Sequence, residues 1–209
     1  MDLASGSPEL SPRPRTVVLV HGIWDFSKIF EPMIRFLSGH GFSAIAPDLL
    51  PSNGAVSLEQ LAEQIAAFVE TSIPPGEPFD LVGFSMGGLV GRYYVQRLGG
   101  IERVGRFITL STPHRGTLWA LTAFNPGSRQ MRPGSSFLAD LNSDAQLLER
   151  VRFASVWTPL DLMIVPANSS RLGVGAEFTV PVALHAWVPK SRRCMALIAE
   201  LLLESPAAS

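Results

Sequence analysis

The most informative part of the chain is Phe79–Leu98, which reads FDLVGFSMGGLVGRYYVQRL. Phe79–Phe84 is an apolar run, and Gly88–Leu98 has a helical pattern. Between them, residues 83–87 form a G-x-S-x-G pattern centred on Ser85. The pattern alone is common by chance, but this strand–turn–helix setting is what a nucleophile elbow needs, with the serine on a strained turn and no Cβ on its neighbouring glycines. The alternative is an ordinary glycine-rich turn or a phosphate-binding helix N-terminus.

Short β-rich runs alternate with longer helical patterns along the rest of the chain, which is typical of β-α-β units on a parallel sheet. The runs are continuously apolar, as strands covered on both faces require. The other candidate strands are Thr16–Val20, Phe42–Ala46, Val104–Leu110, Phe153–Trp157 and Glu177–Pro181. The candidate helices are Ile29–Ser38, Ser57–Thr71 with a Ser57–Gln60 capping box, Gly87–Leu98 and Ser191–Leu203. We therefore predict an α/β fold with about six mostly parallel strands and helices on both faces.

One segment departs from this alternation. Thr112–Arg150 is too long for a tight turn and contains two Pro-Gly breaks before a helical pattern at Phe137–Leu148. A long insertion of this kind is more often functional than idle linker. We expect a polar, flexible leader at residues 1–15 and a single domain at residues 16–209, with a lid-like insertion at about residues 117–148.

Composition excludes several classes of protein. Of the 209 residues 46% are hydrophobic and 17% charged, which favours a folded chain with a sizeable core. The formal net charge of −1 argues against a nucleic-acid binder. The single cysteine, Cys194, cannot form an internal disulfide, and we see no transmembrane span or secretory signal, which fits a cytoplasmic protein. The four histidines are scattered, so we expect no metal and no cofactor.

Three stretches resemble the α/β-hydrolase superfamily, and within it the small bacterial lipases and esterases. They are Val18–Trp24 (VLVHGIW), Leu81–Leu89 (LVGFSMGGL) and Leu110–Thr117 (LSTPHRGT), in the family's order, and Gln130–Asn142 is similar to the cap segment of such lipases. The resemblance runs over nearly the whole chain from Thr16. It implies a minimal α/β-hydrolase fold that lacks the N-terminal antiparallel strands, with a catalytic Ser-His-Asp triad.

A serine hydroxyl is a poor nucleophile unless an imidazole takes its proton and a carboxylate orients that imidazole. The resemblance implies the chain order Ser85, then the acid, then the histidine. His185 follows the last candidate strand, where the family has its general base, whereas His114 is interpreted as structural or as part of a pocket wall. Asp161 follows Phe153–Trp157 and is our choice of acid, because active-site groups collect at the carboxyl ends of parallel strands. Glu177 is the fallback.

The stretch after the first strand supplies the rest of the predicted site. The resemblance implies an oxyanion hole made by the backbone N–H groups of Ile23 and Met86. His21 is interpreted as structural, with its ring bonded to the loop. Asp25 is interpreted as a helix N-cap for the stretch that follows. Of the apolar residues that could line an acyl pocket we favour Trp24 and Trp187, because they flank the catalytic loops; the others are Phe26, Phe84, Met86, Phe124, Met131 and Met163.

The sequence therefore predicts a serine ester hydrolase that cleaves lipid-like acyl esters through an acyl-enzyme. The same triad also serves thioesterases, amidases and acyltransferases, and a ligand-binding protein on this fold is a further alternative. The expected partner is a small-molecule acyl ester or lipid, with peripheral contact to lipid surfaces and without nucleic acid. Nothing in the sequence indicates the oligomeric state.

Overall fold

The computed structural model describes residues 14–204. The predicted leader therefore lies almost wholly outside the described residues. At its end, however, the first strand begins at Arg15, one residue earlier than we predicted.

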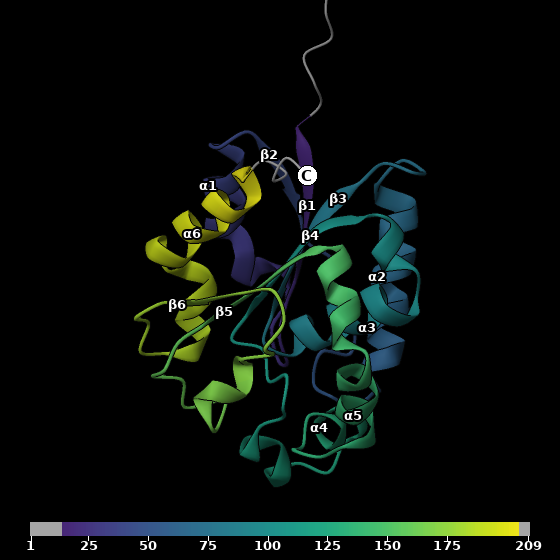
Figure 1. The fold of residues 1–209 in the computed structure, drawn as a ribbon, viewed down its shortest axis with the longest axis vertical. Helices are drawn as coiled ribbons and strands as arrows, with labels where there is room; N and C mark the ends of the chain where they lie inside the picture. The colour runs from purple at the N-terminus through teal and green to yellow at the C-terminus, as the bar shows by residue number, and fades with distance from the viewer. Residues whose placement is uncertain (1–13, 205–209) are drawn as a thin grey trace, which may run out of the picture.

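Six parallel strands form one sheet, which confirms the predicted fold class (Figure 1). Their order across the sheet is β2-β1-β3-β4-β5-β6, and every neighbouring pair is parallel. Each strand lies within a residue or two of its predicted position, because buried runs of apolar residues are needed where helices cover both faces. The strands are β1 (Arg15–Val20), β2 (Phe42–Ile45), β3 (Phe79–Phe84), β4 (Val104–Leu110), β5 (Arg152–Trp157) and β6 (Ala176–Thr179).

Helices cover both faces of this sheet, again as predicted. One face carries α1 (Glu31–Ser38) and α6 (Arg192–Leu203), and the other carries α2 (Leu58–Ser72) and α3 (Met86–Arg97) (Figure 1). Each pair encloses its own cluster of buried apolar side chains against the sheet. The capping box at Ser57 and Gln60 is formed in both directions. The remaining short segments outside the insertion are 3-10 helices at Ser27–Phe30, Gly100–Glu102, Ala167–Ser170 and His185–Lys190.

The insertion between β4 and β5 begins beyond the carboxyl ends of the strands and then returns alongside α3 to the start of β5 (Figure 1). It contains a 3-10 helix at Leu118–Thr122, α4 (Pro126–Gln130), α5 (Ser136–Ser143) and a second 3-10 helix at Ala145–Arg150. The single helix that we predicted at Phe137–Leu148 is thus broken at Asp144. The carboxylate of Asp144 is held at 2.7 Å by Arg97 of α3, and its backbone leaves the helical conformation there.

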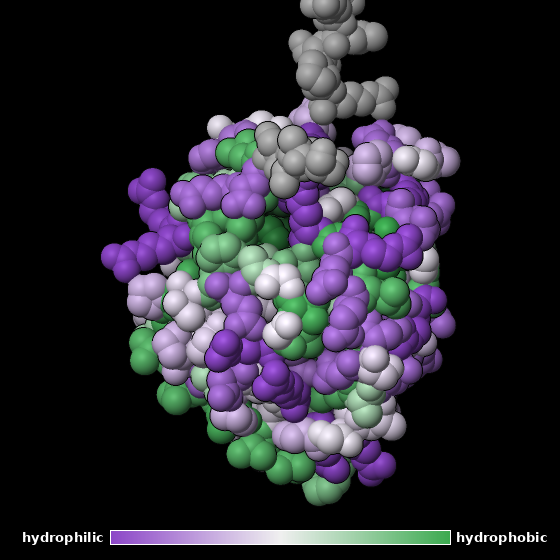
Figure 2. Space-filling model, in the orientation of Figure 1, coloured by the Kyte–Doolittle hydropathy of each residue, from purple (hydrophilic) through white to green (hydrophobic). Residues whose placement is uncertain are grey.

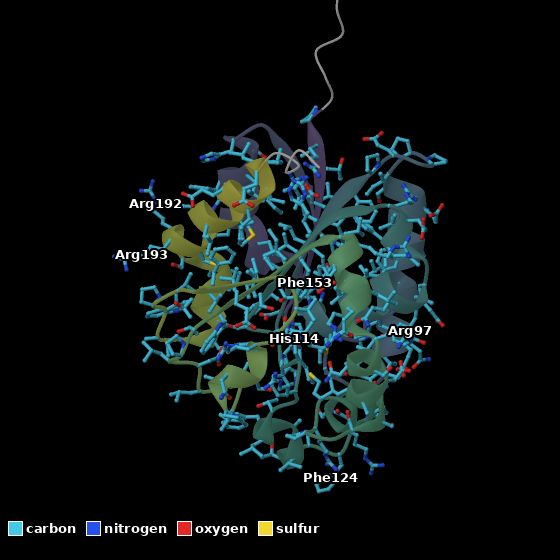
Figure 3. The ribbon with its side chains drawn as sticks, in the orientation of Figure 1. Arg97, His114, Phe124, Phe153, Arg192 and Arg193 are labelled. Atoms are coloured by element: carbon cyan, nitrogen blue, oxygen red, sulfur yellow. The ribbon has the colours of Figure 1, made fainter. Side chains whose placement is uncertain are left out.

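Polar contacts fasten α5 to α3. The buried guanidinium of Arg92 donates to the Leu141 carbonyl at 2.6 Å and to Asn142 Oδ1 at 2.9 Å. Arg97, labelled at the edge of Figure 3, pairs with both Asp140 and Asp144. A buried arginine is costly unless its donors are used, so this contact defines one position for α5.

Candidate active site

Ser85 lies on the turn between β3 and α3 in a conformation that few serines adopt. Its φ is 54° and its ψ is −123°, outside the regions in which L-residues are relaxed. The tight turn depends on missing side chains. A Cβ on Gly87 would lie 2.3 Å from the Val20 carbonyl oxygen, and one on Gly88 would lie 2.0 Å from Thr112 Oγ1. As predicted, a side chain on either glycine after the serine would collide with its neighbours. The turn places Ser85 at the end of the sheet.

His185 and Asp161 are brought together from different loops. His185 Nδ1 donates to Asp161 Oδ2 at 2.8 Å, and the other oxygen, Oδ1, accepts the N–H groups of Met163 and Ile164, both at 2.9 Å. Burial opposes ionisation of Asp161, but these hydrogen bonds outweigh it and hold its pKa below the usual value for an aspartate. The side chain of Asp161 is 1% exposed and therefore has little access to any other partner. This arrangement fixes the imidazole with its Nε2 free for proton transfer.

The fallback acid, Glu177, does not reach this pair. It lies on β6, where its carboxylate accepts from Arg171 at 2.8 Å and from the Gly173 N–H at 3.1 Å. The structure thus leaves Asp161 as the carboxylate beside the imidazole.

Ser85 and His185 line the same cavity. The imidazole packs on the ring of Phe84, the residue before the serine, with their centroids 4.8 Å apart. In the part of the chain that the structure describes, Ser85 Oγ makes no hydrogen bond to the ring. Hydrogen bonds between a serine and an imidazole at such sites are often long without substrate. Here the His185–Asp161 bond is formed and the Ser85–His185 bond is not.

Two backbone N–H groups are free beside the serine. Met86 is the first residue of α3, where the N–H groups of a helix lack partners and the helix dipole favours an anion. The turn that carries Ile23 lies close by, since a Cβ on Gly22 would be 3.1 Å from Ser85 Cβ. Among residues 14–204 no hydrogen bond uses the N–H of Ile23 or of Met86. The arrangement can therefore bind an oxyanion.

The ring of His21 holds this turn in place, as we predicted. The Leu49 N–H donates to His21 Nε2 at 2.9 Å, which leaves the proton on Nδ1 to donate to the Gly22 carbonyl, also at 2.9 Å. The Trp24 N–H donates to the Ser52 carbonyl at 2.8 Å, and Trp24 itself has a φ of 61°. The turn is thus tied to residues 49–52 on one side and packs against the serine on the other.

The cavity has a volume of about 350 Å³ and a mostly apolar wall. Most of that wall comes from the turn after β1, from the insertion and from the loops that carry Asp161 and His185. Its lining residues are Ile23, Trp24, Asp25, Ser85, Pro113, Thr117, Trp119, Ala120, Thr122, Ala123, Ser128, Met131, Met163, Ile164, His185 and Ala186. Of our predicted pocket residues, Trp24, Met131 and Met163 are here, while Phe26, Phe84, Met86 and Phe124 are not among the lining residues.

Trp187 does not line the cavity, which corrects our prediction. The preceding residue, Ala186, faces the cavity, whereas Trp187 lies over a separate shallow depression beside Pro181 and Lys190. The reason is the 3-10 helix that begins at His185, which turns successive side chains away from each other. The tryptophan that the sequence analysis missed is Trp119, whose Nε1 donates to the Leu162 carbonyl at 2.6 Å.

Asp25 does not cap a helix, which corrects our prediction. The 3-10 helix at Ser27 has no side-chain cap at its start, and the Ser27 N–H donates instead to Asp48 Oδ1 at 2.6 Å.

His114 is structural rather than part of the pocket wall. Its ring is fully buried against Phe153, and Thr109 Oγ1 lies 3.1 Å from its Nε2 (Figure 3). Burial holds the pKa of His114 well below the usual value, so the ring is neutral.

The described residues contain neither a candidate metal site nor a candidate membrane span. Between residues 14 and 204, no three His, Cys, Asp or Glu side chains lie close enough to hold a metal ion. Over the same range no helix has both the length and the apolar character needed to cross a membrane.

Comparisons with known proteins find relatives by sequence and by fold. Curated relatives include the lysosomal thioesterase PPT2 of Mus musculus, 30% identical over 106 residues, which are 49% of this chain and 35% of that protein. The match thus spans about a third of the relative. Among solved structures, Bacillus licheniformis lipase BlEst2 in its mature form has a TM-score of 0.73 at 18% identity, over 92% of this chain and 93% of that one. Aspergillus fumigatus lipase B has a TM-score of 0.77 at 16% identity, over 92% of this chain and 54% of that one.

At these identities the solved structures establish the shared fold alone. The match to a family model shows membership of a family as well. The model of the alpha/beta hydrolase family matches residues 17–205, nearly the whole chain, with the elbow, the His185 loop and the turn after β1 all inside the match. The chain belongs to the alpha/beta hydrolase family.

Proposed function

We propose that this protein is a serine carboxylic-ester hydrolase with Ser85 as nucleophile, His185 as general base and Asp161 as the acid that orients it. The observation that carries the proposal is that the strained Ser85 and the imidazole of His185, which is bonded to Asp161 from behind, face one mostly apolar cavity. A serine needs this arrangement for acyl transfer, and an ordinary glycine-rich turn does not.

The reaction follows from the positions of these groups. Ser85 Oγ attacks the acyl carbon while its proton passes to His185 Nε2, and Asp161 stabilises the imidazolium through Nδ1. The N–H groups of Ile23 and Met86 donate to the oxygen that becomes negative. The ester C–O bond then breaks, and His185 returns the proton to the leaving alcohol. A water molecule attacks the acyl-enzyme by the same sequence and releases the acid and the free Ser85.

We propose that the substrate is lipid-like and that the protein contacts lipid surfaces. Exposed large apolar side chains lie in or beside the segments that line the cavity: Trp24, Phe26, Leu118, Trp119, Leu121, Phe124, Leu160, Leu162, Leu184 and Trp187. Phe124 is 73% exposed at the tip of the molecule in Figure 3, where Figure 2 shows a band of apolar residues. Apolar patches of this kind on a soluble surface mark binding sites for apolar partners.

A thioesterase is the second candidate. The curated relatives include the thioesterase PPT2, and its match covers about half of this chain. Both candidates use the same triad and differ only in the leaving atom. The matched substrates propyl octanoate and S-propyl thiooctanoate separate them, since the acyl chain is the same and only the leaving atom changes.

The experiment is hydrolysis of p-nitrophenyl esters from acetate to palmitate, with Ser85→Ala protein prepared in parallel. We expect activity that falls by roughly 10⁵–10⁶ in the variant, the scale of triad deletions in subtilisin. The chain length with the highest kcat/KM then measures how much acyl chain the cavity accepts. A folded wild-type protein that hydrolyses no ester and no thioester would refute the proposal, and activity that survives Ser85→Ala would refute the nucleophile.

A further inference from the structure

Asp25 is a cavity group that the proposed reaction does not use. Of the residues that line the cavity, only Asp25 and His185 are ionisable. His185 has its role as general base. Asp25 has none, and it does not form the helix cap that we predicted for it, because the Ser27 N–H donates to Asp48 instead. A carboxylate in a mostly apolar wall therefore needs another explanation.

The carboxylate lies beside the reacting groups. A Cβ built on Gly22 would be 3.1 Å from Ser85 Cβ and 3.5 Å from Asp25 Oδ2, so both side chains border the same point. Asp25 lines the cavity together with His185, and it lines the adjoining outer cleft together with Lys190. Asp25, Ser85 and His185 therefore face the same cavity, with the Asp25 carboxylate close to the serine.

Asp25 is poorly solvated and has no partner in the chain. Within residues 14–204 no hydrogen bond to its carboxylate is formed, and burial raises its pKa above the usual value. A half-buried carboxylate without a donor is costly, because its lost hydration is not replaced. A bound ligand that donates a hydrogen bond to the Asp25 carboxylate would remove this cost.

The position of Asp25 also indicates which part of a substrate it meets. Trp24 and Asp25 line both the catalytic cavity and an adjoining outer cleft of about 460 Å³, whose other lining residues include Lys28, Glu31 and Lys190. The rest of the cavity wall, from the insertion, is apolar and suits an acyl chain. With the acyl chain there, the leaving alcohol lies at Asp25, where the cavity adjoins the outer cleft that contains the charged side chains of Lys28, Glu31 and Lys190.

We infer that Asp25 determines specificity by accepting a hydrogen bond from a hydroxyl group of the leaving alcohol, so that the preferred substrates are acyl esters of polyols such as glycerol. The inference rests on the proposed function, because it assigns Asp25 to the leaving-group side of the Ser85 reaction. A site built around a buried acceptor discriminates strongly against analogues that lack the donor, since the acceptor is then left unpaired.

Two esters with the same acyl chain test this inference. They are 1-monooctanoylglycerol and propyl octanoate, both used below their aggregation concentrations, and they differ only in two hydroxyl groups. The measured quantity is the ratio of kcat/KM for the glycerol ester to that for the propyl ester, in which any general loss of activity cancels. We expect Asp25→Ala to lower this ratio by roughly 10- to 100-fold, the size of a hydrogen bond to a charged group.

Two more variants sharpen the test. Asp25→Asn keeps the shape and one acceptor oxygen but not the charge, so the ratio should fall less than in Asp25→Ala. Asp48→Ala removes the carboxylate that anchors the same loop at Ser27 outside the cavity, so the ratio should stay at its wild-type value. Equal losses on both esters in Asp25→Ala, or an equal fall of the ratio in Asp48→Ala, would overturn the inference.

A binding measurement separates this inference from the proposed function. If the wild-type protein hydrolyses neither ester, the ester-hydrolase proposal fails, and calorimetric Kd values on Ser85→Ala protein still test Asp25. The glycerol ester should then bind more tightly than the propyl ester, and Asp25→Ala in the same background should remove the difference. Equal Kd values for the two esters in the Ser85→Ala protein would overturn the inference.

Discussion

Gly87→Ala should impair catalysis through the backbone of the neighbouring turn. A Cβ on Gly87 would lie 2.3 Å from the Val20 carbonyl oxygen and 2.4 Å from that of His21. These atoms are backbone and cannot rotate away, so β1 and α3 must separate by about 1 Å to bring the 2.3 Å distance close to an ordinary contact of 3.4 Å. Ile23, two residues after His21, would move with them relative to Ser85.

The expected magnitudes follow from that displacement. A misplacement of about 1 Å at a reacting group costs about 10²-fold in rate, and loss of one oxyanion donor costs about 10²–10³-fold. We therefore expect kcat and kcat/KM to fall together by about 10²-fold, because the lost interaction exists only in the transition state. The overpacked contact should also lower the free energy of unfolding by roughly 1–3 kcal/mol.

The assay is hydrolysis of p-nitrophenyl butyrate together with urea unfolding, and Gly91→Ala is the matched control. Gly91 lies one turn further along α3, where a Cβ would be 3.1 Å from the Phe107 ring and 3.2 Å from Leu81 Cδ2. Those are side-chain atoms that can adjust, so kcat should stay within about threefold of wild type. Unchanged kcat in Gly87→Ala, or an equal loss in Gly91→Ala, would refute the reasoning.

Three other predictions concern the cavity wall and the buried charges. Trp119→Ala should raise KM for p-nitrophenyl decanoate by about 10-fold through lost apolar contact, whereas Trp187→Ala should leave KM unchanged in the same assay. Arg92→Met should lower the free energy of unfolding by roughly 2–4 kcal/mol in urea, because the Leu141 carbonyl and its neighbours lose their donor. Burial raises the pKa of Asp80 to about 7, so the folded state binds its proton more tightly than the unfolded state. Its contribution to stability should therefore fall by roughly 2–3 kcal/mol between pH 5 and pH 8, and the same urea titrations on Asp80→Asn should lack that difference.

The sheet and the serine turn could be predicted because their causes are local. A strand covered on both faces needs an apolar run, and the turn at Ser85 needs glycines at fixed offsets, so both leave a pattern within a few residues. The capping box of Ser57 and Gln60 is equally local and is also formed. The contact between Asp161 and His185 joins residues 24 positions apart, and the prediction of that pair came from the resemblance to the α/β-hydrolases rather than from a local pattern.

The predictions that were wrong depend on contacts between residues that are far apart in the chain. The N–H of Ser27 donates to Asp48, 21 residues away, so nothing near Asp25 in the sequence showed that its carboxylate does not cap this helix. The break at Asp144 depends on Arg97, 47 residues earlier in the chain. Trp119 and Trp187 both lie in 3-10 helices, but only the side chain of Trp119 faces the cavity. Packing sets the direction of each side chain, and the spacing of apolar residues in the sequence does not show it.

The loop after β5 supports both the acid and part of the cavity wall. Met163 and Ile164 donate their N–H groups to Asp161, and the Met163 carbonyl accepts from Thr117 Oγ1 at 2.8 Å. That hydroxyl also accepts the Val165 N–H at 3.0 Å, so the start of the insertion is joined to the segment that positions the acid. Trp119 is joined to the same loop at Leu162. Since hydrogen bonds that share a short segment of backbone hold their partners in one arrangement, the shape of the proposed acyl site and the orientation of His185 depend on each other.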